Sequence, residues 1–365
     1  MSASIVLTGG GTGGHVFPAL AVARVLREHG HHLLFIGTRE GIESRLVPEA
    51  GLDIDFIRSG ALNRVGIRKQ LQTSLLLPAA IATAWRLLKR FRAQAVFSTG
   101  GFVAGPVMLA AVMAGIPVVL MEPNAIPGLA NRKMAKHVYR ALLGLEAARS
   151  WFPASKCEVT GLPVRPEFFE LKPKSSGIFT LLITGGSRGA RTLNRASRES
   201  WPMFRYSTSS IRIIHQTGTA EHAALAEQFA ATQLDGAVLP FIQDMAGTFA
   251  QADLVVSRAG GTVYEIAAAG MPSILVPLPF AADDHQRRNA EALVESGAAR
   301  MVLDSEFTGE RLFQEVDELR NNPDLLASMR QRVRPFAKPG AAERAARILE
   351  EAAGIKKEQA IPPST

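Results

Sequence analysis

Short apolar runs, many of them rich in β-branched residues, alternate with longer amphipathic segments along most of the chain. In the first half the runs predict strands at residues 5–8, 33–36, 95–98 and 118–121. In the second half they predict strands at residues 179–183, 211–215, 238–242, 254–256 and 273–276. Helical patterns follow several of these runs, first at residues 18–29. This alternation predicts an α/β fold with parallel sheets whose faces are covered.

Two glycine-rich loops open the two halves of the chain in the same way. Leu7–Gly10 and Ile183–Gly186 share an apolar–Thr–Gly–Gly step, and each follows a predicted strand. A loop with so few side chains lets backbone N–H groups approach an anion at the positive end of the next helix. The recurrence predicts two Rossmann-like domains that face each other across a cleft. The pattern loosens at residues 161–166, which predicts a domain boundary near residue 163.

The first half carries an excess of basic residues. Residues 1–160 hold 18 Lys+Arg and 9 Asp+Glu, and no acidic residue lies between Asp55 and Glu122. Eight basic residues fall in that gap, namely Arg58, Arg64, Arg68, Lys69, Arg86, Lys89, Arg90 and Arg92. This asymmetry predicts an anionic partner for the first half.

Residues 67–92 are predicted to be helical, with Pro78 starting a second helix. This basic, leucine-rich segment contains Trp85 and could lie in the interface of an anionic membrane. The alternative is an amphipathic helix whose apolar face packs on the sheet. Residues 102–121 carry no charge, but their Gly-Pro punctuation divides them into a helix, a turn and a strand, so no membrane span is predicted there.

Composition narrows the class of protein. The 365 residues suggest two domains, and with 47% hydrophobic and 20% charged residues each half can bury a core. Cys157 is the single cysteine, which excludes an intramolecular disulfide and fits a reducing, cytoplasmic location. The first strand is not preceded by a charged leader and an apolar segment, and we expect no signal peptide.

The most informative loop follows the predicted strand at residues 254–256. Gly260 and Gly261 lead into a helix that ends at Gly270, and Glu265 lies about one turn into it. A carboxylate there could accept two hydrogen bonds from a ribose diol, beside backbone N–H groups suited to a diphosphate. Together they indicate a nucleotide diphosphate site. The alternative is an ordinary turn whose glutamate only complements the helix dipole.

Several other chemistries are excluded. No Gly-Lys-Ser/Thr closes either glycine loop, which excludes a P-loop, and Arg39 stands where a dinucleotide site needs an acid. No His/Cys cluster has metal-ligand spacing, so we predict no metal and no cofactor, and Asp283-Asp284 is only a weak cation candidate.

The polar residues near the glycine loops suit a nucleotide sugar that is attacked by a hydroxyl. They are His15, Asn124, Arg165, Ser187 and Gln286. His15 begins a helix whose dipole favours a neutral ring able to take a proton. The ordinary alternative for a lone histidine is a capping or core residue.

Ordered motifs from residue 4 to about residue 350 resemble the MurG family of peptidoglycan N-acetylglucosaminyltransferases. The motifs are Thr8–Pro18, Gly100–Pro106, Glu122–Asn124, Gly161–Arg165, Gly185–Ala190, Phe241–Met245, Arg258–Glu265 and Asp284–Gln286. The resemblance implies a GT-B fold with an N-terminal acceptor- and membrane-binding domain and a C-terminal UDP-sugar-binding domain. Their residues would be 1–163 plus 336–358 and 164–335, followed by a disordered tail at 359–365.

The resemblance also implies site residues. Those expected to contact the donor are Thr12, Gly13, Gly14, Asn124, Arg165, Ser187, Ile242 and Gln286. The Ile242 backbone would face uracil and Glu265 the ribose, while the backbone of Gly260, Gly261 and Thr262 would stabilise the departing diphosphate. The glycine-rich loops of the N-terminal domain would face the acceptor diphosphate. His15 is the expected general base, and Glu122 is the alternative.

The chain departs from the family pattern at a few positions. Phe102 stands where a tyrosine is expected, and Pro123 and Arg188 stand where glutamines are expected. The 258–265 loop is also one residue shorter than in some relatives. Phe102 has no hydroxyl, which puts in doubt any role of a phenol at this position.

The implied activity is inverting transfer of N-acetylglucosamine from UDP-N-acetylglucosamine to the 4-hydroxyl of lipid I, undecaprenyl-diphosphoryl-N-acetylmuramyl-pentapeptide. The product, lipid II, serves peptidoglycan synthesis, cell shape and cell division. The enzyme would lie peripherally on the cytoplasmic face of the inner membrane through residues 58–92, without a nucleic-acid partner and with cell-wall and division proteins as candidate partners. Two alternatives stay open: a GT-B-fold UDP-sugar 2-epimerase and a non-catalytic nucleotide-binding membrane scaffold.

Overall fold

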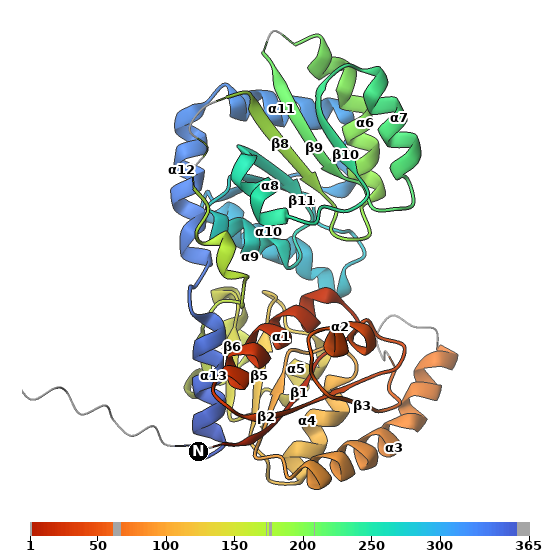
Figure 1. Ribbon diagram of the computed structural model, residues 1–365, viewed down its shortest axis with the longest axis vertical. Coiled ribbons are helices and arrows are strands. Elements are labelled where there is room, and N and C mark those ends of the chain that lie inside the picture. Colours follow the sequence, from red (N-terminus) through yellow and green to blue (C-terminus); the bar gives the residue numbers. More distant parts are fainter. Residues whose placement is uncertain (1, 61–66, 173, 175–176, 208, 356–365) are drawn as a thin grey trace, which may run out of the picture. The chain divides into compact units, whose positions relative to one another are not determined.

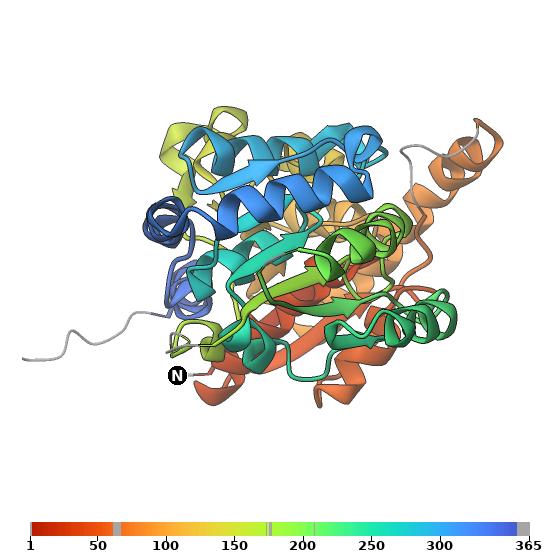
Figure 2. The same ribbon diagram turned by 90° about the horizontal axis from the view of Figure 1, so that it is seen from above.

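The computed structural model describes residues 2–60, 67–172, 174, 177–207 and 209–355. The chain divides into two compact units. Unit 1 comprises Met1–Pro123, Pro127–Pro163 and Gly340–Thr365, and unit 2 comprises Asn124–Ile126 and Val164–Pro339. Each unit contains one parallel β-sheet with helices on both faces (Figures 1 and 2). The predicted α/β class with two Rossmann-like parallel sheets is confirmed.

The described part of unit 1 has a seven-stranded sheet of order β3-β2-β1-β4-β5-β6-β7. Its strands are β1 Ser4–Thr8, β2 His32–Gly37, β3 Ile54–Phe56, β4 Ala95–Ser98, β5 Val118–Glu122, β6 Arg140–Leu143 and β7 Cys157–Val159. The strand order reverses between β1 and β4, which pair in parallel from Ile5↔Ala95 to Thr8↔Ser98. In open parallel sheets, ligands bind at the carboxyl ends of the strands that flank such a reversal. The loops after β1 and β4 are therefore the candidate ligand loops of unit 1.

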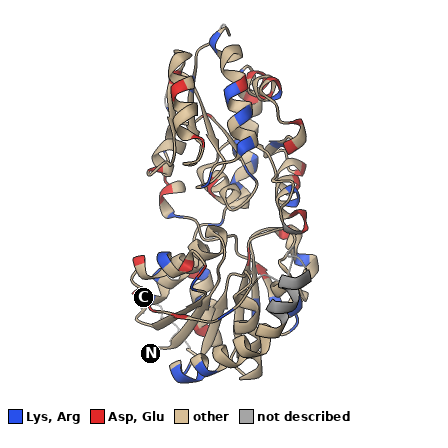
Figure 3. Cartoon of the chain, turned by 90° about the vertical axis from the view of Figure 1, so that its right-hand side faces the viewer, with Lys and Arg blue, Asp and Glu red and all other residues tan. Residues whose placement is uncertain are grey.

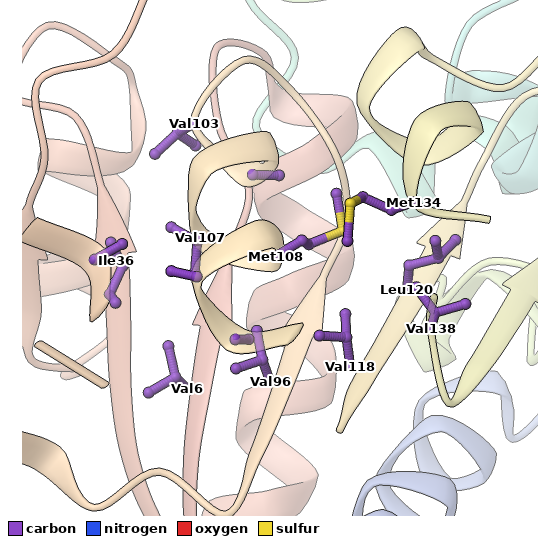
Figure 4. Close-up of a cluster of buried hydrophobic side chains, with 14 of the residues drawn as sticks. Val6, Ile36, Val96, Val103, Val107, Met108, Val118, Leu120, Met134 and Val138 are labelled. Carbon is purple, nitrogen blue, oxygen red and sulfur yellow. The ribbon is translucent and has the colours of Figure 1, made fainter. Parts of the chain in front are cut away.

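Helices cover both faces of this sheet. They are α1 Gly13–Glu28, α2 Glu43–Glu49, α3 Ile67–Phe91, α4 Ala104–Met113, α5 Leu129–Met134 and α13 Ala341–Ala352. On one face, Val107 and Met108 of α4 pack against Val6, Val96 and Val118 of the strands (Figure 4). Side chains alternate between the two faces of a strand, so the residues next to these valines along each strand point toward the opposite face of the sheet.

Helix α1 begins five residues before the predicted start at Pro18, so that prediction was wrong. The Thr12 carbonyl accepts hydrogen bonds from the N–H groups of His15 at 3.1 Å and Val16 at 3.3 Å, which builds a first turn from the glycine run. Gly13 and His15 are thereby helical residues. Helix propensity alone does not predict this start, because glycine is a poor helix former.

Helix α3 is continuous, and the prediction that Pro78 starts a second helix was wrong. Proline removes one backbone donor, yet α3 runs without a break through Pro78, which lies on the exposed side of the helix. Ala80, Ala84 and Leu88 are buried in the unit 1 core. The alternative prediction of an amphipathic helix that packs its apolar face on unit 1 is therefore right for this face of α3.

The described part of unit 2 has a six-stranded sheet of order β10-β9-β8-β11-β12-β13, which reverses between β8 and β11. Its strands are β8 Phe179–Thr184, β9 Ile211–Gln216, β10 Asp235–Leu239, β11 Leu254–Ser257, β12 Ser273–Leu275 and β13 Ala299–Met301. Its helices are α6 Arg191–Arg205, α7 His222–Ala231, α8 Met245–Gln251, α9 Thr262–Ala269, α10 His285–Glu295, α11 Gly309–Arg320 and α12 Pro323–Val333.

The strand predicted at residues 238–242 is displaced, because β10 already ends at Leu239. Pro240 has no N–H group to continue the ladder. The N–H group of Ile242 instead donates to the Gln216 side chain at 2.8 Å, so the chain leaves the sheet here. The predicted disordered tail at 359–365 lies outside the described residues.

Candidate functional site

In unit 1 the loops after β1 and β4 pack directly on each other. The N–H group of Gly10 donates to the Gly100 carbonyl at 3.3 Å. Gly101 has φ +89°, and a Cβ there would lie 2.3 Å from the Gly10 oxygen, so only glycine allows this approach. The two loops therefore form one backbone surface beside the start of α1.

The predicted base His15 lies in the first turn of α1. Its Nδ1 is 3.1 Å from the Thr12 hydroxyl, and its carbonyl accepts a hydrogen bond of 2.7 Å from the Thr99 hydroxyl. Gly13 and Gly14 occupy the first two helical positions, whose N–H groups have no acceptor within a helix. Unit 1 therefore brings a histidine next to a helix end that favours anions.

The alternative base, Glu122, is only 1% exposed. One of its carboxylate oxygens accepts hydrogen bonds from the Gly128 N–H at 3.1 Å and from the Asn131 side chain at 2.8 Å. These contacts hold the segment between β5 and α5. This carboxylate is therefore deeply buried and already accepts two hydrogen bonds within unit 1.

In unit 2 the loop after β8 packs on the turn after β9. Gly189 has φ +73°, and a Cβ there would lie 1.8 Å from the Thr217 oxygen. The buried Gln216 donates to the Gly186 carbonyl at 2.8 Å and accepts from the Ile242 N–H at 2.8 Å. Gln216 thus joins the loop that carries the exposed Ser187 to the segment that carries Ile242.

Glu265 lies in the first turn of α9, and its side chain is 31% exposed. Arg165 places a guanidinium nitrogen 3.5 Å from the Glu265 carboxylate. Burial raises the pKa of Glu265, while the charge and hydrogen bond of Arg165 oppose that rise. Two predicted donor residues thus meet in unit 2, next to Thr262, where α9 begins.

Asn289, a buried residue of α10, connects further predicted residues. Its side-chain nitrogen donates to the Asn124 side-chain oxygen at 3.1 Å and to the Ala259 carbonyl at 3.0 Å. A Cβ on Gly260 would lie 3.6 Å from the side-chain nitrogen of Gln286. Asn124, Gly260 and Gln286 therefore gather around the loop after β11.

Three buried polar residues that support these loops were missed by the sequence analysis: Glu43, Gln216 and Asn289. None of them was singled out from the sequence, and each acts through contacts with separate segments of the chain. Phe102, which stands where the family has a tyrosine, packs its ring beside Gly11. A Cβ on Gly11 would lie 2.9 Å from that ring.

The structure brings together a group of metal-ligand residue types that the sequence analysis also missed. The ligand atoms of His29, His31 and Glu350 lie within 4.8 Å of one another. The Ala3 N–H donates to His31 Nδ1 at 3.1 Å, so Nε2 of the neutral ring carries the proton and donates to Glu350. A cation at Nε2 would have to displace that proton. The cluster is therefore explained as hydrogen bonds that hold α13 against the segment between α1 and β2.

Burial of Glu350 would by itself raise the pKa of this group. Hydrogen bonds from His31 and His29 outweigh burial and hold the Glu350 pKa below its ordinary value.

The chain matches two domain families. The glycosyltransferase family 28 N-terminal domain matches residues 5–143, and the glycosyltransferase family 28 C-terminal domain matches residues 180–348. A relative from Solibacter usitatus is 52% identical over 354 residues, covering 96% of this chain and 97% of that protein. It is named UDP-N-acetylglucosamine–N-acetylmuramyl-(pentapeptide) pyrophosphoryl-undecaprenol N-acetylglucosamine transferase.

Two solved structures show how far the likeness extends. Acinetobacter baumannii MurG superposes with a TM-score of 0.83 at 34% identity, covering 96% of this chain and 99% of that chain. A UDP-GlcNAc 2-epimerase from Neisseria meningitidis, bound to UDP-GlcNAc, superposes with a TM-score of 0.63 at 14% identity, covering 96% of this chain and 100% of that one. The second likeness extends to the fold alone.

Proposed function

The chain belongs to glycosyltransferase family 28, and on that premise we propose that it transfers N-acetylglucosamine from UDP-N-acetylglucosamine to lipid I, making lipid II for peptidoglycan. The observation that carries this proposal is 52% identity, across both units, to a transferase named for that reaction. The epimerase alternative is less supported, because its likeness is limited to the fold at 14% identity. Unit 1 would take the lipid acceptor, and unit 2 would take the nucleotide sugar.

The 4-hydroxyl of the acceptor sugar attacks C1 of N-acetylglucosamine on the face opposite UDP. The bond from C1 to the diphosphate oxygen breaks, UDP leaves with the electron pair, and the α-linked donor gives a β-1,4 product. His15 takes the proton of the attacking hydroxyl. Backbone N–H groups of Gly260, Gly261 and Thr262 stabilise the charge on the departing diphosphate, which is an electrostatic contribution.

The assay that tests the function measures UDP release from UDP-N-acetylglucosamine by the purified protein, with and without a lipid I analogue. Release that requires the analogue, with the sugar recovered on the lipid, is the expected result. Sugar isomerisation without acceptor would favour the epimerase. Nucleotide binding without sugar transfer or isomerisation would favour the non-catalytic nucleotide-binding scaffold.

Glu265→Gln is expected to raise the donor KM about tenfold with little change in kcat. An ionised carboxylate accepts hydrogen bonds through both oxygens, whereas an amide accepts through one, and a hydrogen bond to a charged group is worth about 1.5–3 kcal/mol. The matched control is Glu167→Gln, which alters a half-exposed carboxylate also next to Arg165. An unchanged donor KM in Glu265→Gln would remove the ribose contact from the proposal.

We propose that the enzyme acts at a membrane surface through α3. None of the described helices combines the length and the apolar character needed to cross a bilayer. On α3, however, Leu75 is 74% exposed and Trp85 is 43% exposed. The exposed Arg86 and Lys89 follow, and Figure 3 shows Lys and Arg gathered at the carboxyl-terminal end of α3. Apolar and basic side chains on one segment suit an anionic lipid interface.

The double substitution Leu75→Ser with Trp85→Ser is expected to weaken cosedimentation with anionic vesicles about tenfold or more. Each buried large apolar side chain contributes roughly 1.5–3 kcal/mol to such partitioning. Tyr206→Ser, which removes an aromatic residue that is 88% exposed on unit 2, is the control and should bind vesicles like the wild type. Equal binding by all three proteins would contradict membrane association through α3.

A further inference from the structure

Glu43, the first residue of α2, is a fully buried carboxylate beside the first glycine loop, Gly9–Gly14. One of its oxygens accepts from the Gly11 N–H at 3.2 Å. The other accepts from the Thr38 N–H at 3.1 Å and from the Thr38 hydroxyl at 2.8 Å. An ionised carboxylate is acceptor-only, and these three donors match it. The mechanism proposed above does not use this group.

The space that Glu43 fills is made by glycines. A Cβ on Gly10, Gly37 or Gly41 would lie 2.5, 2.7 or 2.1 Å from Glu43 atoms. Two of these contacts involve carboxylate oxygens. The backbone of three separate positions therefore closes around one charged side chain, and no larger residue fits at those positions without moving it.

The first glycine loop needs such a support. Thr12 is the only residue of this loop with a side chain, and a glycine run loses much conformational freedom when it is ordered. Gly11 has φ +87° and directly precedes Thr12, the residue that caps α1. By accepting the Gly11 N–H, Glu43 fixes the point from which Thr12, Gly13, Gly14 and His15 enter the helix.

We propose that Glu43 is a positioning residue for the acceptor side of the reaction, a role that rests on the proposed function. It holds the first glycine loop so that the helix end and His15 meet the acceptor diphosphate and hydroxyl in a fixed geometry. Its hydrogen-bond partners Gly11 and Thr38 both belong to unit 1, so Glu43 would act through the loop and not by direct contact with substrate. Its removal should therefore impair the acceptor kinetics, while UDP binding, which rests on the residues proposed in unit 2, stays at the wild-type level.

Glu43→Gln is the first test. The amide nitrogen of glutamine must face either the Gly11 N–H or the Thr38 N–H, so one buried donor loses its acceptor. We expect kcat/KM for a lipid I analogue to fall about tenfold or more, while the affinity for UDP, which rests on the residues proposed in unit 2, stays at the wild-type value. Glu49→Gln makes the same chemical change on an exposed carboxylate of α2 and should behave like the wild type.

Gly41→Ala is the second test, because it keeps the charge and displaces Glu43 by a Cβ only 2.1 Å from its oxygens. The same acceptor-side loss is expected. Wild-type acceptor kinetics in both variants would overturn the proposal. A loss of UDP affinity equal to the loss of acceptor kinetics would also overturn it, by showing a general structural role. A wild-type protein that binds UDP and transfers no sugar would overturn the proposed function as well.

Discussion

His15→Ala is expected to lower turnover by about 10²- to 10⁴-fold and to leave UDP binding intact, because general-base help in proton transfer is of that size. The Thr12 hydroxyl lies 3.1 Å from His15 Nδ1. When Nδ1–H donates to that hydroxyl, Nε2 keeps the lone pair that receives the acceptor proton. Donor binding is expected to remain, because the nucleotide residues proposed in unit 2 are untouched.

The measurement is the rate of UDP release with a saturating lipid I analogue, beside the UDP affinity of the same protein. His137→Ala is the matched control, since it removes an exposed histidine of unit 1 outside the glycine loops. A normal turnover in His15→Ala, combined with a large loss in Glu122→Gln, would transfer the base role to Glu122.

Acidification is expected to destabilise unit 2 through His215. This residue of β9 is fully buried, and neither of its ring nitrogens has a hydrogen-bond partner in the described parts of the chain. Burial lowers the pKa of His215 from 6.5 to about 3. In the unfolded chain the His215 ring takes up a proton near pH 6.5, whereas in the folded chain the ring stays neutral down to about pH 3. The stability contributed by the neutral ring is complete above pH 6.5 and falls as the pH drops below it.

Between neutral pH and about pH 4.5 this linkage amounts to about 3 kcal/mol of unfolding free energy. Urea denaturation of the wild type and of His215→Leu at both pH values measures it. The variant should lose about 3 kcal/mol less than the wild type on acidification, because leucine does not titrate. The exposed His137→Leu should follow the wild type. Equal acid sensitivity of wild type and His215→Leu would show that His215 does not carry the effect.

Local patterns were sufficient for the parts of the fold that depend on neighbouring residues. The apolar runs that predicted β1 and β8, and the glycine loops behind them, need only the alternation of side chains and the freedom of glycine. The same loops pointed to a phosphate-binding site because strand–glycine–helix order is itself local. The family resemblance then supplied roles for residues such as Glu265 and Ile242, which periodicity alone does not assign.

Tertiary contacts decided where local rules pointed the wrong way or made no prediction. Helix α3 continues through Pro78 because buried Ala84 and Leu88 hold it against the core, which outweighs one lost backbone hydrogen bond. Glu43 meets Gly11 across 32 positions, and Asn289 meets Asn124 across 165. The sequence by itself thus determined the inner strands of both sheets, the glycine loops and the family, but not the outer strands β3, β6, β7 and β13. The buried polar groups that orient those loops were set by the tertiary structure, because a hydrogen bond joins atoms that are close in space regardless of their separation along the chain.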